Sequence, residues 1–276
     1  MPIFQQPVSA SAADGAEVTI SATWSGKAAA GTNTNSIVKI TDVASAMGTF
    51  SLWLDTGSKY IPIVTPHITW AELSDGTFGA SLSASAATYD GVEFFITDYN
   101  INVISNGTRW LLAGGAATLV TKVGYNAAAG GGIKTAMTAA IPAGLAQAGD
   151  YWEIWQAVEK SGTSADSTTV GHYIGSTGSA ATDTAITTYT GLTGADISEA
   201  QDRKIMVASA TTVIDLGHNG LTPYSTKSTN SMSSAVTVAS MTTNDTSLSL
   251  GLTPGATDDL DLQVGIIKFS TPSSTS

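Results

Sequence analysis

The sequence predicts an all-β protein, with an antiparallel β-sandwich or jelly roll in the C-terminal part and a smaller β-rich domain before it. Short runs of alternating apolar and polar residues recur along the chain, and turn signals separate them at a spacing of about 8–12 residues. Helical periodicity is nearly absent. Hydrophobic residues make up 42% of the 276 residues and charged residues only 12%, a composition that suits short strands joined by small-residue turns.

The first part of the chain alternates as short strands do. In residues 17–24, EVTISATW, every second residue is apolar, which predicts a strand with one inward and one outward face. The runs IVKI, FSLWL, YIPIV, ITWAEL, VEFFI and INVI follow, separated by turn signals such as Asp75-Gly76. We expect an N-terminal arm and first strand over residues 1–35 and a β-rich domain over residues 36–115.

Beyond the boundary that we place near Gly114-Gly115, more regular spacing predicts a jelly-roll sandwich over residues 116–271 and a flexible tail over residues 272–276. Only residues 195–204, ADISEAQDRK, predict a short surface helix. The runs of the sandwich are IKTAMTAAI, YWEIWQAV, TTVGHYI, TAITTYT, KIMVA, TTVIDL, SAVTVAS, TSLSLGL and LDLQVGIIKF.

Charge and residue content argue against several functional classes. The formal net charge is −11 and the sequence pI is near 4.4, which argues against nucleic-acid binding through phosphates. No apolar run approaches the length of a membrane span, so no membrane insertion is expected. Cysteine is absent, which excludes disulfides and thiolate zinc sites.

We expect no cofactor and no metal site. His67, His172 and His218 lie far apart in the sequence and have no metal-ligand spacing. Residues 257–261, TDDLD, could present oxygens to calcium, but they lack the glycine and the distal glutamate of a calcium loop. A turn that leads into the last strand is the better interpretation of this segment.

Residues 52–63, LWLDTGSKYIPI, have the pattern of the catalytic loop of a pepsin-like aspartic protease. Such an enzyme needs two aspartates that share a proton, and the chain has no second Asp-Thr-Gly or Asp-Ser-Gly. We therefore expect no catalytic residue here, but a hairpin in which Asp55 caps the turn. On that interpretation, Asp55→Asn costs at most about 1 kcal/mol. An aspartic protease completed by dimerisation is the alternative.

Aromatic residues supply the candidate contact sites. In YWEIWQAV, strand alternation places Tyr151 and Trp155 on one face and Trp152, Ile154 and Val158 on the other. One face is core, and the other suits a subunit interface or a stacked sugar ring. We favour the subunit interface for Tyr151 and Trp155. Trp110 is a third candidate for an interface or glycan contact.

Three segments carry a resemblance to a known family. Residues 104–110 (ISNGTRW), residues 141–154 (IPAGLAQAGDYWEI) and the final DLDLQVGIIKF resemble the jelly-roll module of tailed-bacteriophage virion proteins, which are tail fibre, head fibre or capsid decoration components. The resemblance covers roughly residues 101–271. It implies a non-enzymatic component of the virion, with no catalytic residues to carry over.

The resemblance also implies partners and a division of labour. It implies a homotrimer that contacts other virion proteins of capsid or tail, with a host cell-surface glycan as a further candidate partner. Residues 1–100 would be the attachment part and residues 116–271 the outward module. An exposed fibre-like or receptor-facing appendage is the leading function. A capsid decoration protein is the alternative, followed by a carbohydrate-binding module and the aspartic protease.

Overall fold

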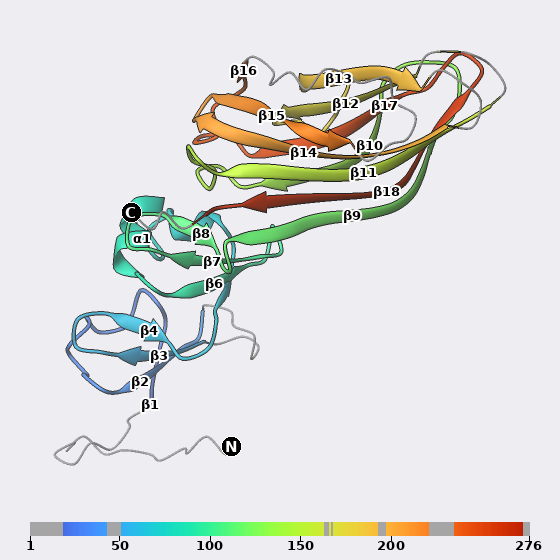
Figure 1. The fold of residues 1–276 in the computed structure, drawn as a ribbon. Coiled ribbons are helices and arrows are strands. Elements are labelled where there is room, and N and C mark those ends of the chain that lie inside the picture. The colour runs from blue at the N-terminus through green and yellow to red at the C-terminus, as the bar shows by residue number, and fades with distance from the viewer. Residues whose placement is uncertain are drawn as a thin grey trace. The chain divides into compact units, whose positions relative to one another are not determined.

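The structure, a computed structural model, describes residues 19–42, 51–162, 166, 168–192, 197–220 and 235–272. The chain forms two compact units, unit 1 (Met1–Ala113) and unit 2 (Gly114–Ser276) (Figure 1). The division falls at the Gly114-Gly115 pair, where both residues have positive φ angles of 77° and 81°, a conformation that suits glycine. The N-terminal arm up to residue 18 lies outside the described residues.

Unit 1 contains two small four-stranded sheets, each of which mixes parallel and antiparallel pairs. Strands β1 and β2 pair in parallel, as do β5 and β6. The first sheet has the order β1 (Thr19–Ala22), β2 (Ile37–Ile40), β3 (Ser51–Asp55), β4 (Tyr60–Pro62). The second has the order β5 (His67–Ile68), β6 (Glu93–Ile96), β7 (Ile101–Ser105), β8 (Trp110–Leu112), with the 3-10 helix η1 (Ala71–Leu73) and the helix α1 (Leu82–Thr88) between β5 and β6.

An aromatic cluster forms the core of unit 1. Trp53 is 0% exposed, and its ring centroid lies 4.8 Å from that of Trp24 and 5.9 Å from that of Phe78. The rings of Tyr89 and Phe94 complete the cluster at 6.0 and 6.2 Å from Trp53. The cluster joins Trp24, which follows β1, and side chains of β3 and β6 to the α1 region, so it holds both sheets of this unit together.

Unit 2 is a sandwich of two antiparallel sheets (Figure 1). The six-stranded sheet has the order β16-β15-β14-β11-β18-β9, and the four-stranded sheet has the order β10-β17-β12-β13. The strands are β9 (Ala116–Ala127), β10 (Lys134–Ile141), β11 (Tyr151–Ser161), β12 (Thr168–Gly175), β13 (Thr184–Leu192), β14 (Ile197–Ser209), β15 (Thr212–Gly220), β16 (Val236–Thr237), β17 (Thr246–Thr253) and β18 (Asp259–Ser270).

This strand order is that of a jelly roll. Apart from β15 and β16, which extend one sheet, the first, eighth, third and sixth strands form one layer and the second, seventh, fourth and fifth form the other. The predicted all-β class is confirmed, and so is the sandwich in the C-terminal part. The order places the last strand, β18, inside its sheet, between β11 and the edge strand β9.

The helix predicted over residues 195–204 is wrong, because residues 197–209 form strand β14. Gln201, Arg203, Ile205 and Val207 alternate inward with exposures of 3, 7, 0 and 0%, a period of two that charged residues in ADISEAQDRK obscured. Helix α1 was not predicted either, because its seven residues, LSASAAT, are mostly small and carry no helical pattern of large apolar side chains. Its start is set by the Ser81 side chain, which accepts a hydrogen bond from the Ala84 N–H.

The interior of the sandwich contains ion pairs as well as apolar side chains. The Lys160 ammonium lies 2.8 Å from the Asp258 carboxylate, and the two side chains are 0 and 1% exposed. Arg203 pairs with Asp215 in the same way, at exposures of 6 and 1%. Buried charges are tolerated only when paired, so loss of one partner of either pair would leave an uncompensated charge in the interior.

Candidate functional site

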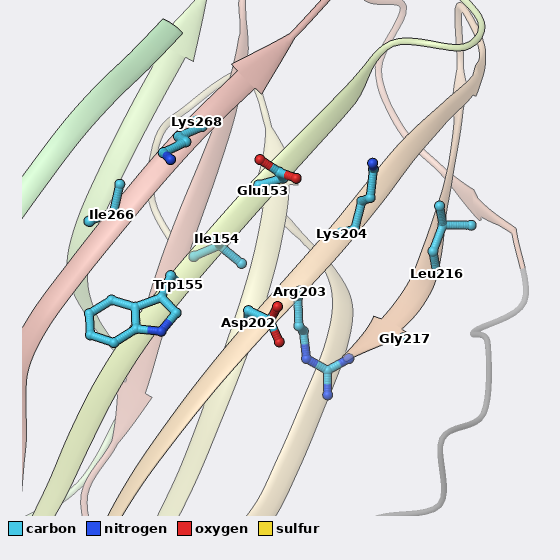
Figure 2. A pocket seen from close by; sticks show the side chains of 10 residues that line it. All are labelled: Glu153, Ile154, Trp155, Asp202, Arg203, Lys204, Leu216, Gly217, Ile266 and Lys268. Carbon is cyan, nitrogen blue, oxygen red and sulfur yellow. The ribbon is translucent and has the colours of Figure 1, made fainter. Parts of the chain in front are cut away.

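A groove lies on the outward face of the six-stranded sheet of unit 2, over strands β11, β14, β15 and β18 (Figure 2). Its volume is about 620 Å³, within the range of about 300–1,000 Å³ that is typical of small-molecule sites. Side chains that shape it include Glu153, Trp155, Lys204, Leu216, Ile266 and Lys268.

The alternation of β11 turns Trp155 toward this groove. Its neighbours Trp152, Ile154 and Val158 point into the sandwich and are 0, 1 and 0% exposed, as the sequence predicts. Trp155 is 36% exposed. In the sheet it lies opposite Ile266 of β18 on one side and Asp202 of β14 on the other, so an apolar and an acidic neighbour flank its ring.

Glu153 lies two residues before Trp155 on the same face, between two lysines. In the sheet register it is opposite Lys204 of β14 and Lys268 of β18, and Figure 2 shows the three side chains together at the upper part of the groove. The Lys204 ammonium lies 3.4 Å from the ring centroid of Tyr151, in cation–π geometry. The groove therefore combines one exposed aromatic ring with carboxylate and ammonium groups.

The three contact residues predicted from the sequence lie in different environments: two lie at or beside the groove, and the third is buried. Trp155 lines the groove, and Tyr151 lies beside it, partly exposed under Lys204. Trp110 lies in unit 1 and is only 3% exposed. Its indole N–H donates to the Ser85 hydroxyl at 2.9 Å, and its ring meets that of Phe94 at 5.3 Å. The expectation for Trp110 is corrected: it is a core residue.

The sequence did not single out the other groove residues. Lys204, Leu216, Ile266 and Lys268 come from other strands. The pairing of β11 with β14 and β18 brings Lys204, Ile266 and Lys268 to Trp155, and the pairing of β14 with β15 adds Leu216. Each is an ordinary surface residue in its own strand. The one available signal was the outward stripe of Tyr151, Glu153 and Trp155 in YWEIWQAV.

Asp55 is a buried residue whose carboxylate is bound by backbone groups. It ends β3, is 0% exposed, and accepts hydrogen bonds from three backbone N–H groups. Gly31 donates to Oδ1 and Oδ2 at 2.8 and 3.0 Å, Asn33 to Oδ2 at 3.1 Å and Gly57 to Oδ1 at 2.9 Å. The predicted turn cap is present at Gly57, and the carboxylate also fastens the loop around Gly31 to the hairpin.

These contacts change the expected cost of Asp55→Asn. An amide would place its NH₂ against backbone donors and lose charge-assisted hydrogen bonds, so we expect unit 1 to lose about 1.5–3 kcal/mol of unfolding free energy at neutral pH. This exceeds the cost of about 1 kcal/mol for a simple cap. Asp75→Asn is the matched control, because Asp75 is exposed and accepts one bond, from the Thr77 N–H. Urea unfolding of both variants measures the difference.

The loss of unfolding free energy caused by Asp55→Asn is expected to depend on pH. Burial alone would raise the pKa of Asp55, but the N–H groups of Gly31, Gly57 and Asn33 outweigh it and hold the pKa below its usual value. Because the folded pKa is depressed, the stabilisation is fully present above the unfolded pKa of about 3.9 and is lost as the pH falls through the folded value. The gap between wild type and Asp55→Asn should therefore close on acidification. A gap that stays constant would contradict this role.

Two of the three histidines contact neighbouring side chains. His67 packs against Phe95, with ring centroids 4.7 Å apart, and the buried His172 contacts the Gln156 side chain at 2.9 Å. The side chain of His218 lies outside what the structure describes. Within the described part of the chain, no group of His, Asp or Glu side chains is arranged to hold a metal ion. None of the described helices is long and apolar enough to cross a membrane.

The TDDLD segment leads into the last strand: Thr257 and Asp258 precede β18, and Asp259–Asp261 are its first residues, so the turn predicted here is limited to the start of the segment. Asp258 faces Lys160, while Asp259 accepts hydrogen bonds from the Ala129 N–H at 2.7 Å and the Asn126 amide at 3.1 Å. These bonds lower the pKa of Asp259. Asp261 accepts from the same Asn126 amide at 2.6 Å, so the acidic side chains bind protein donors.

Comparison with known proteins places the chain in no family. No protein-family model matches it, and no curated protein sequence matches it. Among solved structures it is similar to the CBM2 module of the evolved Dit of Lactobacillus casei BL23 phage J-1, with a TM-score of 0.28 and 8% identity over 49% of this chain and 69% of that chain.

Two further similar structures come from infectious bursal disease virus. The Gx strain structure has a TM-score of 0.23 and 12% identity, over 58% of this chain and 38% of that one. The VP2 subviral particle has a TM-score of 0.24 and 13% identity, over 74% of this chain and 55% of that one. These three structures are of viral proteins.

Proposed function

We propose that the chain is a non-enzymatic structural component of a bacteriophage virion, an exposed fibre-like or receptor-facing appendage. The complete jelly-roll strand order of unit 2 carries this proposal, because that architecture recurs in viral capsid and lectin domains. One fold serves many functions, so the sequence resemblance over residues 101–271 narrows the choice to a virion protein.

The ISNGTRW segment, which contributes to that resemblance, forms the β7–β8 hairpin. The Asn106 side chain accepts hydrogen bonds from the N–H groups of Thr108 and Arg109 at 3.1 and 2.9 Å, and Gly107 has a φ of 82°. Trp110 then anchors the hairpin in the core. The segment is thus a structural element that comes just before Gly114, where unit 2 begins, in agreement with a junction between an attachment part and an outward module.

Strand β9 supports assembly with further copies of the chain. It is twelve residues long and stands at the end of the six-stranded sheet as the structure describes it. Val123 in this strand is 74% exposed. A long, exposed edge strand invites unwanted pairing unless another chain or segment covers it. In the proposed homotrimer a second copy covers β9, and repetition of this contact around a threefold axis closes the assembly.

Val123→Lys is expected to dissociate the trimer, because an ammonium in an apolar contact loses hydration without gaining a partner. We expect association to weaken by more than about 1 kcal/mol per contact, measured by native mass spectrometry over a concentration series. Ile63→Lys is the matched control, since Ile63 is 49% exposed in unit 1. A wild-type monomer at micromolar concentration would contradict the trimer, and a trimeric Val123→Lys would contradict this contact.

The virion role is tested on particles that lack the protein. We expect the purified full chain to bind to such particles, and electron microscopy with a labelled chain to show it at a tail or at a fibre. Label spread evenly over the head would favour the alternative, a capsid decoration protein. A chain that binds to no part of the particle would contradict both.

A further inference from the structure

We propose that the groove around Trp155 binds a neutral hexose-type sugar. A hexose has one face made largely of C–H groups and a rim of hydroxyl groups. It therefore needs an aromatic ring to stack on and polar groups beside that ring, both exposed to solvent before binding. The groove supplies this combination on one sheet face, with Trp155 36% exposed and Glu153 two residues before it.

Polar groups of the groove are available to a ligand. Among the described residues, neither the Glu153 carboxylate nor the Lys268 ammonium has a hydrogen-bond or ion-pair partner, and Lys204 contacts only the Tyr151 ring. Glu153 can accept hydrogen bonds from two adjacent hydroxyl groups, and Lys268 can donate to a third oxygen. Figure 2 shows Glu153 and Lys268 on the same side of the groove, above the Trp155 ring.

The charge balance of the groove favours a neutral sugar over an anionic one. The ammonium groups of Lys204 and Lys268 are matched in number by the carboxylates of Glu153 and Asp202, so these four side chains carry no net charge together. The Arg203 guanidinium does not add to this sum, because it pairs with the buried Asp215. The whole chain carries a formal charge of −11, which repels a polyanion. A phosphate or a sialic acid would therefore lack a net positive site.

The shape and lining of the groove separate this proposal from a subunit contact at the same residues. Interface cores are tightly packed and depleted of charge. Here four charged side chains, those of Glu153, Asp202, Lys204 and Lys268, surround a hollow of about 620 Å³. A flat partner surface would leave that volume unfilled and would bury those charges. On this proposal Trp155 belongs to a ligand site rather than to the interface that the sequence favours, and β9 is the proposed subunit contact.

The test uses the full chain and the methyl glycosides of glucose, galactose and mannose as probes. Saturation-transfer NMR is expected to detect at least one of them, with the transfer strongest at the C–H protons of one sugar face, and a titration gives its dissociation constant. Trp155→Ala should weaken that binding by about 30-fold, whereas Trp155→Phe should retain part of it. Sialyllactose should bind no better than the neutral probes.

A matched pair of acidic variants tests the hydrogen bonds. Glu153→Gln removes the carboxylate charge in the groove, and we expect it to weaken binding by about tenfold. Glu159→Gln changes the same strand and the same face outside the groove, where Glu159 accepts a hydrogen bond from the Gln263 amide at 2.8 Å, and we expect no change. No transfer to any probe, preferred binding of sialyllactose, or equal binding by Trp155→Ala would each overturn the proposal.

This inference names the ligand class for the proposed receptor-facing function, but its test does not depend on the particle. A chain that binds a glycoside but joins no particle would support the sugar site and contradict the virion role. A chain that joins the particle but binds no probe would support the virion role and contradict the sugar site.

Discussion

Lys160→Met is expected to lower the free energy of unfolding of unit 2 by about 3–5 kcal/mol, because it leaves the carboxylate of Asp258 buried without its cation. The two side chains are 0 and 1% exposed, and their charged atoms lie 2.8 Å apart. Methionine preserves most of the side-chain volume of lysine, so the loss reports the charge rather than a cavity. Denaturant unfolding at fixed protein concentration measures it.

Two further variants show whether the pair itself is responsible. The double variant Lys160→Met, Asp258→Leu should recover most of the loss, since apolar replacements for both partners remove the uncompensated charge. Lys134→Met changes an exposed lysine in the same unit and should stay within about 0.5 kcal/mol of wild type. A Lys160→Met variant as stable as Lys134→Met would refute the role of the buried pair.

Trp53→Ala should destabilise unit 1 by about 3–5 kcal/mol, the usual cost of deleting a buried large aromatic side chain. Trp53 is 0% exposed, its indole N–H donates to the Ser51 hydroxyl at 2.6 Å, and its ring contacts those of Trp24 and Phe78. The deletion leaves a cavity and an unpaired hydroxyl. Near-ultraviolet circular dichroism during denaturant unfolding follows this aromatic cluster directly.

Trp53→Phe provides the comparison for that variant. It keeps an aromatic ring in the cluster and removes only part of the volume, so we expect a distinctly smaller loss than for alanine. Equal losses for both variants would mean that the indole hydrogen bond to Ser51, rather than ring packing, holds Trp53 in place. A loss below about 1 kcal/mol for Trp53→Ala would contradict its central place in the core.

The jelly roll was predictable because most of its strands have one buried face. In β11 the alternation of Trp152 and Ile154 with Glu153 and Trp155 matches the observed burial. Strand β9 left no such pattern, since it is an edge strand exposed along most of its length and only Ala127 is buried. Its place in the sheet comes from pairing with β18, far along the chain.

Only part of the groove could be predicted, because the rest depends on strand pairing. The stripe of Tyr151 and Trp155 could be read within one strand, but Lys204 and Lys268 join it through strand register. The same lack of local information explains Trp110. Its sequence neighbours suggest a turn, and only packing against Phe94 and Ser85 shows that the ring is buried.

The position of the last two strands has a consequence for synthesis of the chain on the ribosome. Strand β18 lies between β11 and β9, and β17 lies between β10 and β12. Neither sheet of unit 2 can therefore close until the C-terminal segment has left the exit tunnel, whereas unit 1 is complete well before that. Nascent unit 2 exposes unpaired strands throughout this interval, which makes translation the period of greatest aggregation risk. Loss of β18, Asp259–Ser270, would leave β9 and β11 without their shared partner.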